Sequence, residues 1–350
     1  MKENFEKFMK KILIVCLALS AFFSCKKDDP ITPGKYGAGL LILNEGPFGT
    51  GSGTIGFWDR SDKAPVNDVF ETENTGAKLG NILQSMTQSG EKFYFVVNNS
   101  NKVVVTDKNF KYLSEISGLQ LPRYLVVKGS KAYISQWGSD GLTGSLVVAD
   151  LATGQLTKTI PLGKGPENML IKGDKLYVSM VGGYDRDNRV MVVDLVGETV
   201  SKTITVDDNP SNIIDYNGQI LVLCKGFTDY VNPANSTNGK IVEISNDAVS
   251  ATYNLSEQAD NLIRKGNSST LYFTLNGKPS KWEYKAANFE TLQGAPFIYK
   301  LSYDDVAGKV LMSDAVDFAS KGKILVADEN LNVSKTIDAG IIPSLVYVIK

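Results

Sequence analysis

The sequence predicts an all-β fold: a seven-bladed β-propeller with four antiparallel strands per blade, closed into a ring by the C-terminal strand pairing into blade one. Three observations predict it: a repeat of 44 residues, four strand-like segments in each repeat, and an incomplete repeat at each end of the chain. A period of about 20–50 residues is typical of solenoids, propellers and arrays, and four strands per about 40–45 residues make one propeller blade.

The repeat is clearest between residues 122 and 206. Pro122-Arg-Tyr-Leu-Val-Val-Lys-Gly-Ser-Lys-Ala-Tyr-Ile-Ser135 is followed by Pro166-Glu-Asn-Met-Leu-Ile-Lys-Gly-Asp-Lys-Leu-Tyr-Val-Ser179, and Pro210 comes after the same step of 44 residues. Each copy has short runs of β-branched and aliphatic residues bounded by Gly, Asn, Asp or Ser, which is the composition of strands joined by tight turns. No window shows convincing helical spacing of its apolar residues, which argues against a helical repeat.

The third strand of each repeat allows the blades to be counted. Its seven copies occupy residues 53–59, 101–107, 144–150, 188–194, 239–245, 280–285 and 322–328. Several copies end in an aspartate, and this regular recurrence favours a turn-forming role for the residues Asp59, Asp107, Asp150, Asp194 and Asp328.

The two ends of the chain complete the count. Only one strand, Leu40-Leu-Ile-Leu-Asn44, precedes the first copy of the third strand, whereas the chain finishes with an extra opening strand, Pro343-Ser-Leu-Val-Tyr-Val-Ile349. We therefore expect the C-terminal strand to be the innermost strand of blade one and to close the ring non-covalently. Closure removes the unpaired sheet edges that promote aggregation.

The residues before the propeller, which is predicted over 38–350, are expected to direct and anchor the protein. Lys10-Lys11 precede the apolar run Ile12–Phe23, which is too short to span a bilayer and is typical of a signal peptide. Cys25 after Ser24 resembles a lipobox, which predicts a lipoprotein signal peptide over residues 1–24 and a lipidated tether over residues 25–37. The alternative is ordinary signal cleavage nearby, leaving a free cysteine.

Cys25-Lys-Lys-Asp-Asp29 resembles the acidic export signal of surface lipoproteins of the Bacteroidetes. We therefore expect the protein to be anchored by lipid in the outer membrane and exposed at the cell surface. A diacylated thiol together with an acylated N-terminus supplies more than one chain, which is enough for stable anchoring.

Composition excludes several classes of function. The chain of 350 residues carries a net charge of −1, which argues against a nucleic-acid-binding surface, and it contains no histidine. Histidine-based catalytic triads and the usual zinc and haem ligand sets are therefore excluded, and no metal or cofactor is expected. Of the three cysteines, Cys16 leaves with the signal peptide, Cys25 carries lipid, and Cys224 lies in an apolar strand where it is expected to be a core residue.

The predicted ligand-binding face carries the loops between the second and third strands, together with the residues just before each innermost strand. Most of these loops pair an aromatic side chain with amide or carboxylate groups, which suits a ring-shaped or sugar-like ligand. The alternative for each aromatic residue is that it packs loop against loop. The residues of this second set are Gln84, Arg123, Glu167, Ser211, Asp260, Tyr299 and Ser344. The ligand-binding residues predicted from both sets are Asn44, Glu45, Phe48, Asn98, Asn99, Arg123, Trp137, Glu167, Tyr184, Phe227, Tyr230, Asp260 and Phe318.

Other motifs carry no chemistry. Asp185-Arg-Asp-Asn188 lacks the Gly and the distal Glu of a calcium loop, and the Gly-rich segment Gly46–Gly53 lacks the Lys-Ser/Thr of a phosphate loop. No pair of carboxylates stands out by spacing, so no catalytic residue is predicted.

Several segments resemble a known family. Ala132-Tyr-Ile-Ser135 and Leu176-Tyr-Val-Ser179 resemble the YVTN-type, YncE-like propeller family. Asn44-Glu-Gly-Pro-Phe48, Val97-Asn-Asn-Ser100 and Gly340-Ile-Ile-Pro343 resemble a Bacteroidetes group of surface-layer-like propeller lipoproteins, within and beside which are proteins that capture cobalamin above a TonB-dependent transporter. The resemblance implies a non-enzymatic surface-binding protein, with a corrinoid as the most concrete ligand.

Three functions compete. The first is a binding lipoprotein that captures a small molecule or glycan and passes it to an outer-membrane transporter. The second is a propeller enzyme resembling lactonases, lyases or glycosidases, with a carboxylate site around Glu45, Glu167 or Asp260. The third is an adhesion or surface-layer module that binds another protein. The first is favoured, so the protein is expected not to be an enzyme, and the role of the insertion at residues 228–238 stays open.

Overall fold

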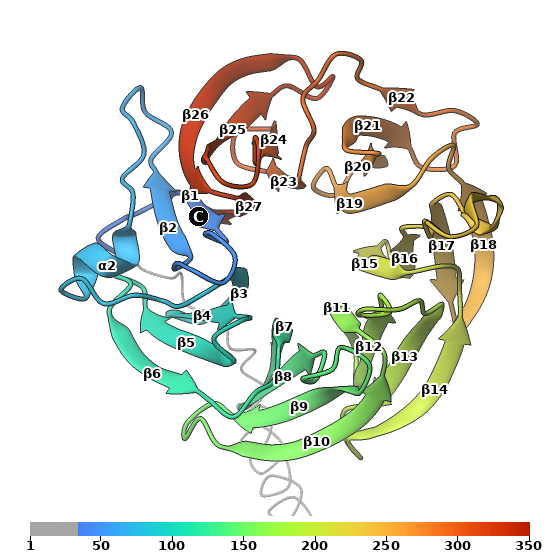
Figure 1. The fold of residues 1–350 in the computed structure, drawn as a ribbon, viewed down its shortest axis with the longest axis horizontal. Helices are drawn as coiled ribbons and strands as arrows, with labels where there is room; N and C mark the ends of the chain where they lie inside the picture. Colours follow the sequence, from blue (N-terminus) through green and yellow to red (C-terminus); the bar gives the residue numbers. More distant parts are fainter. Residues whose placement is uncertain (1–33) are drawn as a thin grey trace, which may run out of the picture. The chain divides into compact units, whose positions relative to one another are not determined.

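A computed structural model of the protein describes residues 34–350. These residues form one compact unit of seven antiparallel sheets arranged as blades around a central axis (Figure 1). The only helical elements in residues 34–350 are the short helix α2 (Val69–Glu73) and the 3₁₀ turn η2 (Pro233–Asn235). The predicted seven-bladed all-β propeller is therefore confirmed.

Each blade runs from its innermost to its outermost strand in chain order, except the first. Blade one contains β27 (Pro343–Ile349), β1 (Gly39–Asn44) and β2 (Thr54–Trp58). Blade two contains β3 (Leu83–Ser89), β4 (Lys92–Val97), β5 (Lys102–Asp107) and β6 (Tyr112–Ile116). Blade three contains β7 (Pro122–Lys128), β8 (Lys131–Gln136), β9 (Gly144–Asp150) and β10 (Leu156–Gly163). Blade four contains β11 (Pro166–Lys172), β12 (Lys175–Met180), β13 (Arg189–Asp194) and β14 (Thr199–Thr205).

The remaining three blades follow the same order. Blade five contains β15 (Pro210–Tyr216), β16 (Gln219–Cys224), β17 (Lys240–Ser245) and β18 (Ala248–Asn254). Blade six contains β19 (Ala259–Arg264), β20 (Thr270–Leu275), β21 (Lys278–Glu283) and β22 (Glu290–Thr291). Blade seven contains β23 (Lys300–Asp304), β24 (Lys309–Asp314), β25 (Lys321–Ala327) and β26 (Val333–Ile341).

The ring closes as the sequence predicts. The C-terminal strand β27 pairs antiparallel with β1, with Ile42 opposite Val346. Beyond the strand ends, the backbone N–H of Glu45 donates to the carbonyl of Ile342 at 2.9 Å. Blade one is therefore assembled from both ends of the described chain.

Blade one departs from the regular pattern at its outer position. Val66 and Phe57 exchange two backbone hydrogen bonds of 2.8 Å, but the pairing extends no further and the chain then enters α2. Residues 60–68 offer a single β-branched residue among Asp, Lys and Pro, and proline cannot donate to a ladder. The fourth position of this blade is thus a bridge rather than a strand.

The core lies between blades. Strand β4 buries five successive residues, Phe93 to Val97, because neighbouring blades cover both of its faces, whereas four of the five residues in the outer strand β6 are exposed. Each fully buried aliphatic or aromatic side chain contributes about 1.5–3 kcal/mol of apolar burial.

Serine hydroxyls in the second strands link neighbouring blades. Ser135 Oγ donates to the carbonyl of Glu167 at 2.7 Å, and Ser179 Oγ lies 3.3 Å from the carbonyl of Ser211. These serines end the repeated Tyr-Ile-Ser and Tyr-Val-Ser segments, so the recurring motif joins blades three and four to the start of the innermost strand of the following blade.

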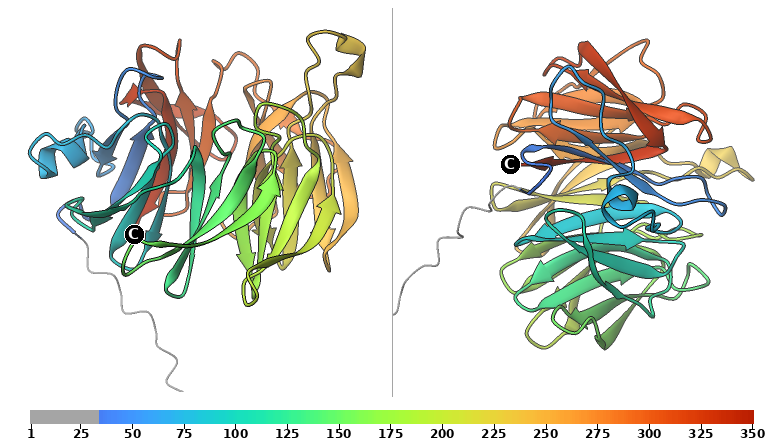
Figure 2. Two further views of the ribbon diagram at one scale, coloured as in Figure 1. Left: turned by 60° about the horizontal axis from the view of Figure 1, so that its bottom comes forward. Right: turned by 90° about the vertical axis from the view of Figure 1, so that its left-hand side faces the viewer.

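The chain enters the propeller on the face opposite to the loops that join second and third strands. Lys35 N donates to Asn109 Oδ1 at 2.7 Å, and Tyr36 OH donates to Glu73 at 2.6 Å. Asn109 lies just after the C-terminal end of β5. The N-terminal end of β5, which follows the loop from β4, lies roughly 20 Å away because a strand rises about 3.3 Å per residue. The insertion that carries η2 projects from that other face (Figure 2).

The predicted signal peptide (1–24), Cys25 and most of the tether (25–37) lie outside the described residues. Over residues 34–350, no helix has the length and apolar character needed to cross a membrane.

Candidate functional site

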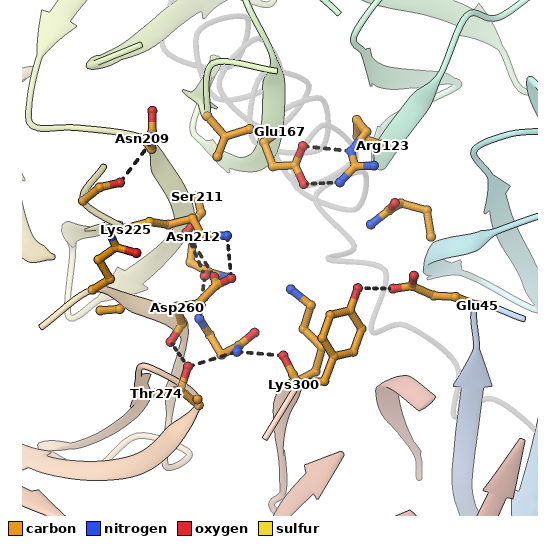
Figure 3. Close-up of a pocket in the computed structure, with 18 of the residues that line it drawn as sticks. Glu45, Arg123, Glu167, Asn209, Ser211, Asn212, Lys225, Asp260, Thr274 and Lys300 are labelled. Atoms are coloured by element: carbon orange, nitrogen blue, oxygen red, sulfur yellow. Dashed lines mark hydrogen bonds and ion pairs between the residues drawn. The ribbon is translucent and has the colours of Figure 1, made fainter. Parts of the chain in front are cut away.

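A cavity of about 790 Å³ opens at one end of the propeller axis. It lies where the innermost strands begin and where the loops between second and third strands meet, and all seven blades contribute to its wall (Figure 3). This is the face that the sequence predicts for ligand binding.

Nine of the thirteen predicted residues line this cavity: Glu45, Phe48, Asn98, Arg123, Trp137, Glu167, Tyr230, Asp260 and Phe318. Their role in binding a ligand stays a prediction. The other four lie outside its wall. Asn44 is buried and accepts a hydrogen bond from Gly340 N at 2.9 Å, Asn99 donates to Asn81 at 2.7 Å, and Tyr184 and Phe227 pack against Trp137 and Arg186.

Arg123, Trp137 and Glu167 form a closed cluster on one side of the cavity. Arg123 Nε and Nη2 donate to the two oxygens of Glu167 at 2.9 and 2.8 Å, and Trp137 Nε1 donates to Glu167 Oε2 at 3.0 Å. The guanidinium carbon lies 4.2 Å from the centroid of the Trp137 ring, a cation–π geometry. Burial alone would lower the pKa of Arg123, but the Glu167 carboxylate outweighs it and raises that pKa.

Glu45 and Tyr299 meet across the seam between blades one and seven. Tyr299 OH donates to Glu45 Oε1 at 2.8 Å, and only 8% of Glu45 is exposed. Burial raises the pKa of Glu45, an effect that the hydrogen bond from Tyr299 offsets only in part. Burial also raises the pKa of Tyr299, which the neighbouring carboxylate reinforces. Glu45 therefore titrates above an ordinary glutamate while it lines the cavity.

Asp260 lies on the opposite wall and is held by several donors. Lys225 Nζ lies 2.8 Å from Asp260 Oδ2, while Asn261 N donates to Oδ1 at 2.8 Å and Ser211 Oγ lies 3.3 Å from it. Burial alone would raise the pKa of Asp260, but the positive charges of Lys300 and Lys225 outweigh it and hold the pKa well below its usual range. Asp260 is thus an ionised, fully hydrogen-bonded carboxylate.

Amide side chains are the most frequent polar groups of the wall. Seven of them line the cavity: Gln84, Asn98, Asn209, Asn212, Gln258, Asn261 and Asn276. Each amide offers donors and an acceptor, so the wall can pair with hydroxyl, amide or carbonyl groups of a ligand.

The sequence pattern did not predict that Lys300, Asn212 and Asn261 line the cavity. Strict alternation predicts that only one of two successive strand residues faces the axis, and the prediction placed the preceding residues Tyr299, Ser211 and Asp260 there. The register shifts at the start of β15 and β19, between Pro210 and Asn212 and between Asp260 and Ile263, so both successive residues line the cavity. In each case a second polar residue directly follows the predicted position, and this was the sequence signal that could have identified it.

Within residues 34–350, no cluster of three or more acidic or cysteine side chains is arranged to hold a metal ion. Cys224 is buried in β16, where burial raises the pKa of its thiol.

The family described as "Domain of unknown function (DUF5074)" matches residues 38–333. No curated protein matches the sequence significantly.

Solved structures share the fold at low sequence identity. A quinoprotein alcohol dehydrogenase-like protein from Bacteroides thetaiotaomicron is 16% identical, with a TM-score of 0.68 over 89% of this chain and 78% of that chain. The periplasmic gluconolactonase of Pseudomonas aeruginosa is 13% identical, with a TM-score of 0.60 over 89% and 99%. The hydrazine synthase of Kuenenia stuttgartiensis is 17% identical, with a TM-score of 0.62 over 78% and 94%.

These similarities overturn the expectation that the protein is not an enzyme. That expectation used the propeller as a binding scaffold, whereas structures described as a gluconolactonase and a hydrazine synthase have the same fold. Similarity at this identity shows the fold alone, so the activity has to be argued from the site.

Proposed function

Because the chain belongs to the family described as "Domain of unknown function (DUF5074)", which specifies no activity, we propose from the site itself that the protein binds a polar small molecule in the axial cavity. The convergence of seven amide side chains on one cavity carries this proposal. The volume, about 790 Å³, falls within the usual range of roughly 300–1,000 Å³ for small-molecule sites.

The first ligand candidate is a corrinoid. The resemblance to cobalamin-capturing propeller lipoproteins motivates it, and an amide-lined wall can form reciprocal hydrogen bonds with the amide groups around a corrin ring. Exposed aromatic side chains at the mouth, Phe48 and Tyr230 among them, offer flat apolar contact to the part of such a ligand that the cavity does not enclose.

The position of the cavity suits a lipid-anchored capture protein. We propose anchoring through Cys25 in the outer membrane, at the cell surface, and transfer of the ligand to an outer-membrane transporter. The chain enters the propeller beside Asn109, on the face opposite to the cavity. An anchor on that side leaves the cavity accessible from solution.

Isothermal titration of residues 30–350 with cyanocobalamin tests this function. We expect tight binding that Trp137→Ala weakens, because Trp137 lines the cavity and stacks on Arg123. The control is Tyr112→Ala, which removes an exposed aromatic side chain from the outer strand β6. No heat at micromolar cyanocobalamin would reject the corrinoid and direct the search to glycans.

Hydrolysis is a second candidate, favoured by one observation. Glu45 lines the cavity, is buried, and has a raised pKa, which are the properties of a general acid or base. Turnover of small lactones or glycosides that Glu45→Gln abolishes would establish an enzyme. Unchanged turnover in Glu45→Gln would remove Glu45 from that role.

A further inference from the structure

Three cationic side chains line the cavity, and two of them are neutralised by a carboxylate. Arg123 forms two hydrogen bonds with Glu167, and Lys225 lies 2.8 Å from Asp260. The Lys300 ammonium group forms no hydrogen bond or ion pair with another described residue. It lies 5.3 Å from the centroid of the Tyr299 ring. Lys300 is half-buried and points into the cavity (Figure 3).

The neighbouring carboxylates are already engaged by other donors. Asp260 uses one oxygen for Lys225 and the other for Asn261 N and Ser211, and Glu45 accepts from Tyr299. A partly desolvated ammonium is stabilised most by an oxyanion within hydrogen-bond reach, and the protein supplies none to Lys300. The cavity therefore contains a positive charge whose natural partner is a ligand oxygen.

Asn212 offers a donor on the same wall. Its Oδ1 accepts from Asn261 N at 3.1 Å and lies 3.3 Å from Ser211 Oγ, so its NH₂ group is left to donate to a ligand. Asn212 and Lys300 occupy equivalent positions at the start of the innermost strands β15 and β23, two blades apart, with Asp260 and Asn261 between them.

We propose that Lys300, assisted by Asn212, forms an anion subsite in the axial cavity that binds a carboxylate or phosphate group of the ligand. This inference rests on the proposed binding function and specifies the ligand class, a polar molecule with an anionic group. The two sources are a phosphodiester, as in the nucleotide loop of a complete corrinoid, and a carboxylate, as in a sugar acid.

The experiment compares ligands that differ in the anionic group. Residues 30–350 and the variant Lys300→Met are titrated with cyanocobalamin and dicyanocobinamide, which lacks the phosphate-bearing loop, and with D-glucuronate and D-glucose. In one of the two pairs, we expect Lys300→Met to weaken binding of the ligand that carries the phosphate or carboxylate group by about 10- to 100-fold. Binding of the ligand that lacks this group should be unchanged. The pair that responds identifies the source.

Thermal melting in inorganic phosphate separates this inference from the identity of the ligand. Phosphate should raise the Tm of the wild-type protein above its value in chloride, and Lys300→Met should remove the increase. Lys300→Arg should restore it, and Lys63→Met, which removes an exposed lysine outside the cavity, is the control. Circular dichroism and gel filtration of Lys300→Met and Lys300→Gln establish that the fold is kept.

Two outcomes are decisive. If phosphate stabilises only proteins with a cation at position 300 while none of the organic probes binds, the proposed ligand classes fail and the anion subsite stands. If phosphate and the anionic probes act equally on the wild-type protein and Lys300→Met, the subsite is overturned even where a neutral ligand binds.

Discussion

Arg60 and Asp304 form a bidentate ion pair between blade one and blade seven, where the propeller closes. Arg60 Nε and Nη2 donate to the two oxygens of Asp304 at 2.7 and 3.0 Å. Arg60 follows β2 in blade one, and Asp304 ends β23 in blade seven, where only 1% of it is exposed. The carboxylate also accepts backbone N–H groups of Val306 and Ala307 at 3.0 and 3.1 Å, so the same residue forms a turn and joins the last blade to the first.

Replacing Arg60 by methionine should destabilise the propeller substantially. The change leaves the Asp304 carboxylate buried without a countercharge, which costs roughly 3 kcal/mol of the free energy of unfolding. Asp62→Asn is the matched control, because the Lys335–Asp62 pair crosses the same seam with a fully exposed Asp62. Urea unfolding measures both, and equal losses would contradict a specific role for the buried pair.

The stability of this seam should fall in acid. Burial alone would raise the pKa of Asp304, but the hydrogen bonds from Arg60 and the backbone outweigh it and lower that pKa. A carboxyl whose folded pKa is lowered stabilises the fold above its unfolded pKa of about 3.9, and the contribution disappears as the pH falls below that value. We expect the difference in unfolding free energy between wild type and Asp304→Asn to shrink between about pH 4 and pH 2. A constant difference over this range would contradict the assignment.

Removing residues 343–350 should prevent formation of the closed ring. The truncation deletes β27 and exposes the edge of β1, an apolar strand whose six residues are all buried in the intact protein. We expect aggregation or loss of the folded monomer in gel filtration. Removing Lys350 alone is the control, since this residue follows β27 and forms only an exposed ion pair with Asp305. A soluble, folded monomer ending at residue 342 would contradict closure by this strand.

Glu45 should make anion binding depend on pH. Ionised Glu45 repels an anion held at Lys300, whereas protonated Glu45 does not, so affinity should increase as the pH falls through the raised pKa of Glu45. Glu45→Gln should bind with an affinity independent of pH in this range. Tyr299→Phe removes a hydrogen bond that lowers the pKa of Glu45, so its transition should move to higher pH. Titrations at pH 5, 6, 7 and 8 measure this, and a flat wild-type profile would contradict it.

The fold could be predicted because each repeat contains residues that specify nearby turns and strand starts. The aspartates that end third strands accept backbone N–H groups of the following turn, as Asp150 does from Ala152 and Thr153 at 3.1 and 2.9 Å. Proline opens the innermost strands β7, β11 and β15 at a constant step of 44 residues, which fixes the period, and the surplus opening strand β27 predicts closure. The aspartates and prolines lie within a few residues of the turns and strands that they specify, whereas β27 pairs with β1 at the other end of the described chain.

The site could be predicted only in part, because its polar groups meet across blades. Arg123 and Glu167 occupy equivalent positions one repeat apart, so the repeat predicted that each lies on the binding face. It did not predict that the two side chains form an ion pair with each other. Asn212 lines the cavity beside Ser211 because the register shifts at the start of β15, which breaks the alternation of side chains. Such an irregularity has no distinct mark in the sequence.

The pairing of β1 with β27 has a consequence for how the protein is made. The backbone N–H of Glu45, which follows β1, donates to the carbonyl of Ile342, which directly precedes β27. The wall of the cavity is therefore completed only after β27 has been synthesised, so interrupted or proteolysed chains that lack this strand should lack the complete cavity. Synthesis of β27 is in this way a condition for an intact cavity wall.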